Sequence, residues 1–149
     1  MKAQEIMTEN PICCTPSESI HNAAKLMMDN DIGALPIVDD TQGLHLIGML
    51  SDRDIVCRVM AKDGMACDQA TVQDAMTAGT LLFVHPDASV DDVIDLMEQG
   101  QVRRIPVVDD SNKVLGIIST ADIALEVDEP DEIAEVFEVI SEPTNIPHA

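Results

Sequence analysis

The sequence predicts an α/β protein of tandem β-α-β-β-α repeats packed about a pseudo-twofold axis, followed by a short C-terminal helix. Three observations support this fold: motifs recur at a nearly constant offset, and each copy contains one amphipathic helical stripe and two strand-like runs. "GMLSDRDI", starting at Gly48, returns as "GIISTADI" at Gly116, and "LPIVDD", starting at Leu35, returns as "IPVVDD" at Ile105. Ordered repetition of this kind indicates that the chain arose by duplication.

The first long helix of each copy is expected shortly after a proline, Pro16 or Pro86. In both copies the apolar residues follow the i, i+3, i+4, i+7 spacing of a helix with one buried face. These residues are Ile20, Ala23, Ala24 and Met27 in the first copy, and Val90, Val93, Ile94 and Met97 in the second. Ser17 and Asp87 stand where an N-cap is expected.

Two strands and a second helix complete each copy. The β-branched runs "ALPIV" and "RIPVV" each end in an Asp-Asp turn and are followed by the return strands "HLIGML" and "KVLGII". The second helices are expected to begin near Asp52 and Thr120. We place the first repeat at 1–68, the second at 69–126, and an acidic C-terminal helix and tail at 127–149.

The C-terminal segment contains one further helical stripe. Its apolar residues are Ile133, Val136, Phe137 and Ile140. We expect this helix to lie on the repeat pair or on a partner subunit. Pro143 and Pro147 are expected to end it.

The charge balance excludes two classes of partner. The 149 residues include 28 acidic and 8 basic side chains, for a net charge of −20. Such a surface repels nucleic-acid phosphates and anionic lipids, so we expect neither nucleic acid nor membrane as a partner. No apolar run approaches the roughly 20 residues that span a bilayer, and the first residues lack the apolar region of a signal peptide. We expect a cytoplasmic protein.

The arginines and cysteines give weaker indications. All four arginines fall in two windows, Arg53 with Arg58 and Arg103 with Arg104, which suggests two anion sites. The cysteines form no C-x-x-C pair and the histidines have no metal-ligand spacing. We therefore interpret the cysteines as small apolar residues in a reducing compartment, and we expect no metal and no cofactor.

The repeated Ser-x-x-Asp has two interpretations. Ser51 with Asp54, and Ser119 with Asp122, have the spacing of a capping box that starts a helix. The same junction could instead bind a ligand, with backbone amides and the serine hydroxyl on a phosphate and the aspartate on a ribose diol. The motif alone leaves both interpretations open.

The wider pattern resembles a CBS-domain pair, or Bateman module, across residues 1 to about 126. The similar features occur in order in both copies: the opening "MT" at 7–8 and 76–77, the apolar helix, "[LI]P[IV]VDD" and "G-x-[LI]-S-x-x-D-I". "SDRDIVCR" is similar to the form found in small stand-alone members. The resemblance implies a non-catalytic regulatory module that dimerises and binds an adenosine-containing nucleotide, AMP, ADP or ATP, in the cleft between its repeats.

The resemblance also implies site residues. At one site Asp122 would hold the ribose, with Ser119 and Arg104 on the phosphates and the adenine against the other repeat, which supplies Thr8, Cys13, Ile32 and Ala34. At the other site the corresponding residues would be Asp54, Ser51, Thr77, Phe83 and Val102. Every apolar residue among these also fits an ordinary core position.

The two implied sites differ in three positions. Arg53 in the first copy stands where the second has Ala121, so the two sites are not chemically equivalent. Ala34 replaces the phosphate-facing Arg104, and Phe83 leaves less room for a purine. We therefore expect the Asp122 site to bind more tightly.

Two other functions compete with nucleotide sensing. The chain could be a ligand-free dimerisation or interaction module, acting on an unknown protein partner. Catalysis by Asp52 and Asp54 is disfavoured because residues two apart on a helix start diverge, and no His–Cys spacing supports thiol chemistry. We also expect a homodimer, because helical faces carrying Met27, Met28, Met60 and Met97 would otherwise expose an apolar patch.

Overall fold

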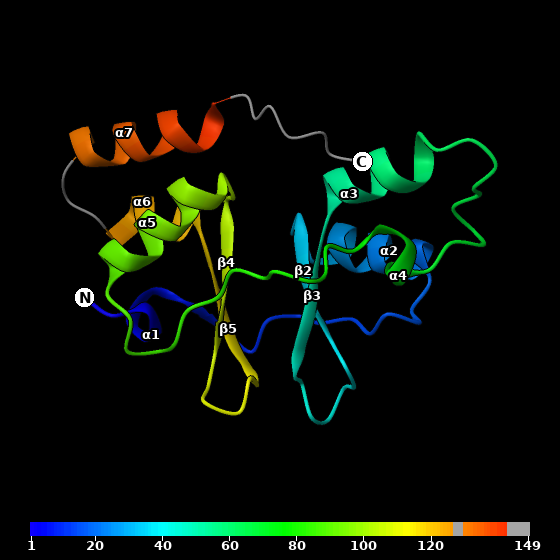
Figure 1. Ribbon diagram of the computed structural model, residues 1–149, viewed down its shortest axis with the longest axis horizontal. Helices are drawn as coiled ribbons and strands as arrows, with labels where there is room; N and C mark the ends of the chain where they lie inside the picture. The colour runs from blue at the N-terminus through cyan, green and yellow to red at the C-terminus, as the bar shows by residue number, and fades with distance from the viewer. Residues whose placement is uncertain (127–129, 143–149) are drawn as a thin grey trace. The chain divides into compact units, whose positions relative to one another are not determined.

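The computed structural model describes residues 1–126 and 130–142, apart from the side chains of Pro130 and Glu132. The chain forms two compact units, drawn in Figure 1. The first-repeat unit is Pro11–Leu81, and the second-repeat unit combines Met1–Asn10 with the described residues from Leu82 onward. The α/β prediction is confirmed, and none of the helices within these residues is long and apolar enough to cross a membrane.

The first-repeat unit contains one strand pair and four helical segments. Its elements are α2 (Ile20–Asn30), β2 (Ala34–Val38), β3 (Leu46–Ser51), α3 (Asp52–Ile55), the π-helical turn η1 (Val56–Met60) and α4 (Val72–Ala75). β2 and β3 pair antiparallel, with Ala34 opposite Ser51. A single bridge between Met49 and Thr77 adds the "MT" segment of the second copy to this sheet.

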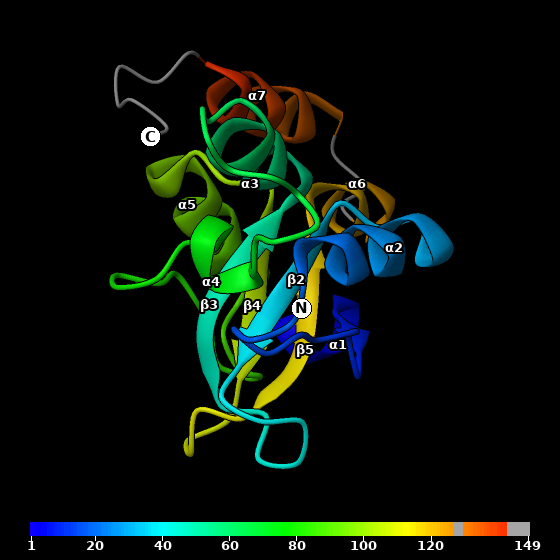
Figure 2. The same cartoon turned by 90° about the vertical axis from the view of Figure 1, so that its right-hand side faces the viewer.

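The second-repeat unit has the same plan with an added helix. Its elements are α1 (Ala3–Ile6), β1 (Thr8–Glu9), α5 (Val90–Gly100), β4 (Arg104–Val108), β5 (Val114–Ser119), α6 (Thr120–Glu126) and α7 (Pro130–Ser141). The strand order is β1-β5-β4, all antiparallel, and Figures 1 and 2 both show β4 and β5 side by side. The "MT" segment of the first copy therefore belongs to the sheet of the second.

The glycine of each return strand makes room for the "MT" segment that joins its sheet. A Cβ atom on Gly48 would lie 3.0 Å from the Thr77 carbonyl oxygen and 3.1 Å from Met76 Sδ. A Cβ atom on Gly116 would collide with the Met7 side chain. The glycine in "GML" and "GII" is thus explained by the close approach of the "MT" segment.

The long helices bury the expected faces, with two corrections. Val90, Val93, Ile94 and Met97 are buried in the second copy, and Ile20, Ala23 and Met27 in the first, but Ala24 is exposed. The predicted N-caps Ser17 and Asp87 are wrong. After each proline the chain first forms a turn, which in the first copy is closed by a hydrogen bond from Glu18 N to Thr15 O. Each helix therefore starts later than expected. The caps are Ser19 and Ser89, whose hydroxyls accept from Asn22 N at 3.0 Å and Asp92 N at 3.1 Å.

Helix α7 lies on the core of the second-repeat unit. It contacts α5 and α6, which lie beneath it in Figure 1, and it buries Val136 and Ile140. Ile133 is half-buried, whereas Phe137 is exposed, so the expected four-residue apolar stripe is only partly buried. Residues 143–149, including both prolines that were expected to end the helix, lie outside the described residues.

The exposed methionines differ from those expected. Met27 and Met97 are buried in the cores of their own units, because each lies on the inward stripe of its helix. Met28 and Met60 are exposed, together with Val56. The exposed large apolar side chains on the helices are therefore Met28, Val56 and Met60 in the first-repeat unit, and Leu125 and Phe137 in the second.

Candidate functional site

Both Ser-x-x-Asp motifs form complete capping boxes where a strand passes into a helix. Ser51 N donates to Asp54 Oδ2 at 2.9 Å, and Asp54 N donates to Ser51 Oγ at 3.1 Å. In the second copy the corresponding distances are 2.8 Å and 3.2 Å, and Ser119 Oγ lies 3.0 Å from Asp122 Oδ2. The structural interpretation of the motif is therefore correct in both copies.

The capping boxes leave one carboxylate oxygen of each aspartate unused. In both copies the box occupies Oδ2. Within the described residues Asp122 Oδ1 has no hydrogen-bond partner, and Asp54 Oδ1 lies 3.9 Å from Arg58 Nε. A carboxylate accepts several hydrogen bonds, so helix capping and binding of a hydroxyl group by the same aspartate are compatible.

The strand opposite each serine supplies a different residue. Arg104 is the register partner of Ser119, and Ala34 is the register partner of Ser51. Arg104 is half-buried, and in residues 1–126 and 130–142 its guanidinium has no hydrogen bond or ion pair. An unpaired guanidinium on the residue opposite a serine suits a phosphate or carboxylate group.

Each "MT" threonine lies in the unit whose Ser-x-x-Asp it was expected to serve. Thr8 pairs with Ile117, two residues before Ser119, and Thr77 pairs with Met49, two residues before Ser51. Both threonines are exposed. Each unit therefore contains the serine, the aspartate and the threonine of one implied site.

The other implied residues are divided between the units. Ala121 is exposed on α6 and Arg53 is exposed on α3, each next to its own aspartate. Cys13, Ile32 and Ala34, expected at the Asp122 site, belong to the first-repeat unit, whereas Phe83 and Val102, expected at the Asp54 site, belong to the second. Ile32 and Val102 pack on the cores of their own units, which agrees with the alternative that these apolar residues occupy ordinary core positions. Their contact with a ligand stays a prediction.

Arg58 makes contacts that the arginine pattern of the sequence did not predict. Its Nη1 donates to Met76 O at 3.1 Å and to Ala75 O at 3.3 Å, the last carbonyls of α4. These contacts give Arg58 a structural role, and its grouping with the other arginines as an anion site stays a prediction. The signal for its pairing was present in the sequence, because Asp54 and Arg58 are four residues apart on a predicted helix.

The cysteines lie in the first-repeat unit and are all free thiols. Burial raises the pKa of Cys13 to about 11, and burial, with smaller contributions from Glu18 and Cys13, raises the pKa of Cys14 to about 11. Cys14 belongs to the core, and Cys13 Sγ donates to Pro11 O at 3.3 Å. Protonated, buried thiols are poor nucleophiles, which agrees with their interpretation as small apolar residues.

The chain is similar to known proteins in both sequence and fold. The chain is 38% identical over 122 residues to hypoxic response protein 1 of Mycobacterium tuberculosis, covering 82% of each chain. The crystal structure of hypoxic response protein I with two coordinated zinc ions matches with a TM-score of 0.75 and 36% identity, over 85% of this chain and 99% of that one. Among the described residues here, no three His, Cys, Asp or Glu side chains are grouped to hold one metal ion.

Two similar structures contain adenosine derivatives. The CBS-domain pair of protein MJ0100 in complex with 5′-methylthioadenosine and S-adenosyl-L-methionine has a TM-score of 0.73 and 31% identity, over 84% of this chain and 94% of that one. CBSX2 in complex with AMP has a TM-score of 0.70 and 26% identity, over 83% and 93% of the two chains. The CBS domain model matches residues 3–61 and 72–129, so the chain belongs to the CBS-domain family and contains two CBS repeats.

Proposed function

We propose that this protein is a non-catalytic regulatory module that binds an adenosine-containing nucleotide at its Ser-x-x-Asp sites. The main support is the arrangement around Asp122. Its Oδ1 is unused within the described chain, Ser119 precedes it at the end of β5, and the unpaired Arg104 stands opposite Ser119. This set offers an acceptor for a ribose diol and a hydroxyl and a cation for a phosphate.

The complexes of similar proteins support the same ligand class. MJ0100 was solved with 5′-methylthioadenosine and S-adenosyl-L-methionine, and CBSX2 with AMP. The ligands share adenosine, whose ribose diol is the group that an aspartate can hold with two hydrogen bonds. We infer that AMP, ADP or ATP is the ligand class of this chain and that it acts in the cytoplasm.

We further propose that the module works as a homodimer. Met28, Val56 and Met60 are 72%, 51% and 62% exposed on α2 and η1. Exposed large apolar side chains such as these are typical of protein–protein interfaces. Nucleotide binding would then be transmitted through the dimer or to a protein partner.

A thermal-shift experiment tests the nucleotide proposal. AMP, ADP and ATP are each added to the purified protein, with GMP, GDP and GTP as matched controls. A ligand at a hundredfold excess over its Kd stabilises the native state by about 2.7 kcal/mol, which raises the melting temperature by several degrees. If no nucleotide moves the midpoint at millimolar concentration, the proposal fails, and the exposed Met28, Val56 and Met60 favour a ligand-free interaction module.

A further inference from the structure

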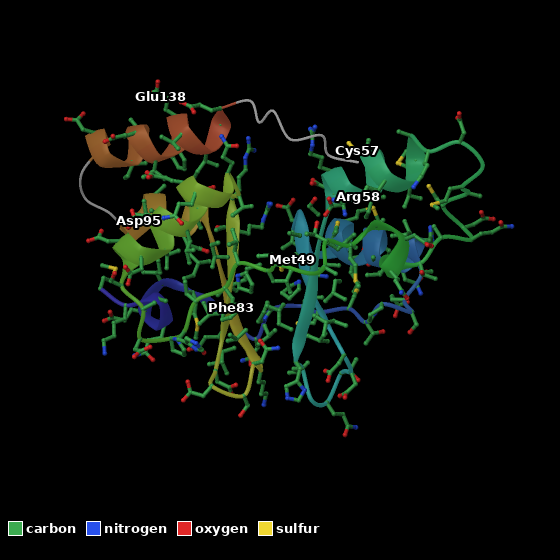
Figure 3. All side chains as sticks on the ribbon, in the orientation of Figure 1. Met49, Cys57, Arg58, Phe83, Asp95 and Glu138 are labelled. Atoms are coloured by element: carbon green, nitrogen blue, oxygen red, sulfur yellow. The ribbon has the colours of Figure 1, made fainter. Side chains whose placement is uncertain are left out.

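One guanidinium connects the two parts of the Asp54 site that lie in the first-repeat unit. Arg58, labelled on η1 in Figure 3, places Nε 3.9 Å from Asp54 Oδ1 and donates through Nη1 to Ala75 O and Met76 O. Thr77 follows Met76 directly and pairs with Met49. Arg58 thus lies between the carboxylate expected to hold the ribose and the segment expected to face the adenine.

This contact is partly shielded from solvent. The side chains of Arg58 and Asp54 are 26% and 20% exposed. A charge pair at such a position is screened less by water and salt than a pair on the open surface. The Asp54 carboxylate is also fixed on its other oxygen by Ser51 N. Its orientation is therefore determined from two sides.

Capping of α4 explains only half of this arrangement. The last carbonyls of a helix lack intrahelical partners, so an arginine that donates to them stabilises the helix end. Capping of α4 does not by itself require Arg58 to lie next to Asp54. Residues 124–126, which correspond to the start of the π-helical turn that carries Arg58, are α-helical in α6.

The second repeat cannot form the same contact. Asp122 lies 68 residues after Asp54, and the residue 68 positions after Arg58 is Glu126. Glu126 carries the same charge as Asp122 and has no side-chain donor. A substitution at Arg58 therefore distinguishes the two sites.

We propose that Arg58 is a positioning residue of the first-repeat nucleotide site, holding Asp54 and the Ala75–Thr77 segment in one fixed arrangement. This assignment rests on the proposed function. Arg58 itself need not touch the nucleotide. Without Arg58, Asp54 and Thr77 can move independently. The entropic cost of ordering them then falls on the binding step, which lowers the affinity for the nucleotide.

Calorimetry with an adenine nucleotide tests the assignment one site at a time. Asp122→Asn isolates the first-repeat site and Asp54→Asn isolates the second. Arg58→Met is expected to weaken the first-repeat site about tenfold or more and leave the second unchanged, since it removes the hydrogen bonds of a charged donor to Ala75 O and Met76 O. Arg58→Lys, which keeps the cation but has a single donor nitrogen, should give an affinity between those of the parent protein and Arg58→Met. Lys62→Met is the matched control, because it removes an exposed cation four residues later.

Amide hydrogen exchange provides a second measurement. Arg58→Met should speed exchange of the Met76 and Thr77 amides, which donate to Val72 O and Met49 O, and Lys62→Met should not. Equal loss of affinity at both sites, or unchanged affinity at the first-repeat site, would overturn the positioning role. If the parent protein binds no adenine nucleotide at all, the proposed function itself fails and this assignment falls with it.

Discussion

Arg104 on β4 is the register partner of Ser119 on β5, and its guanidinium is unpaired throughout the described chain. In the first repeat the same relationship joins Ala34 to Ser51. At this position the two repeats therefore present the same backbone frame, with a cation in the second repeat and none in the first. This difference determines which site should bind a phosphorylated ligand more tightly.

Arg104→Met and Asp122→Asn should each weaken the tighter nucleotide site about tenfold or more, because a hydrogen bond to a charged group contributes about 1.5–3 kcal/mol. Asp54→Asn should leave that site unchanged. Calorimetry with AMP and ATP measures all three. Arg103→Met is the matched control, since Arg103 is exposed and carries the same charge one residue earlier. If Asp54→Asn abolishes the tight binding and Asp122→Asn does not, the sites have been assigned in the wrong order.

Gly116→Ala should destabilise the second-repeat unit by about 1–3 kcal/mol, the usual cost of overpacking. The added methyl group would collide with Met7, which belongs to the segment that carries β1. Urea unfolding measures the loss. Met7→Ala combined with Gly116→Ala should recover part of it, because the two residues interact directly. Strictly additive effects of the two substitutions would contradict the close approach.

The sequence predicts the repeated elements well because their signals are local. The β-branched runs become β2 and β4, the return strands become β3 and β5, and the second helices begin at Asp52 and Thr120 as expected. Ser-x-x-Asp also forms the capping box that its spacing predicts. In each case residues within about one turn or one strand determine the structure.

Long-range pairing could not be predicted in the same way. The placement of Thr8 beside Ile117 joins residues more than 100 positions apart, and no local pattern encodes it. Arg58 donates to carbonyls 17 and 18 residues away, a contact that its i,i+4 spacing from Asp54 does not indicate.

The thiols of Cys13 and Cys14 should react slowly with iodoacetamide at pH 8, since each has a pKa of about 11 and the thiolate is the reactive form. The same shifts predict a pH dependence of stability. Both thiols stay protonated in the native state while the unfolded chain ionises near pH 9, so their contribution is present below pH 9 and lost between about pH 9 and 11. Urea unfolding across this range measures the decline. Cys13→Ala with Cys14→Ala should flatten it, and an unchanged slope would show that other groups cause it.

Met28→Asp with Met60→Asp should convert the proposed homodimer into a monomer. Both residues are exposed on helices of the first-repeat unit, so a charge there costs little in the free chain but is buried without a partner in a dimer interface. Light scattering at tens of micromolar protein gives the mass. Leu125→Asp is the matched control, because Leu125 is 82% exposed on α6 of the other unit and should leave the mass unchanged. A parent protein that is monomeric at this concentration contradicts the dimer. A dimer that survives the double substitution but dissociates on Leu125→Asp places the interface on the second-repeat unit instead.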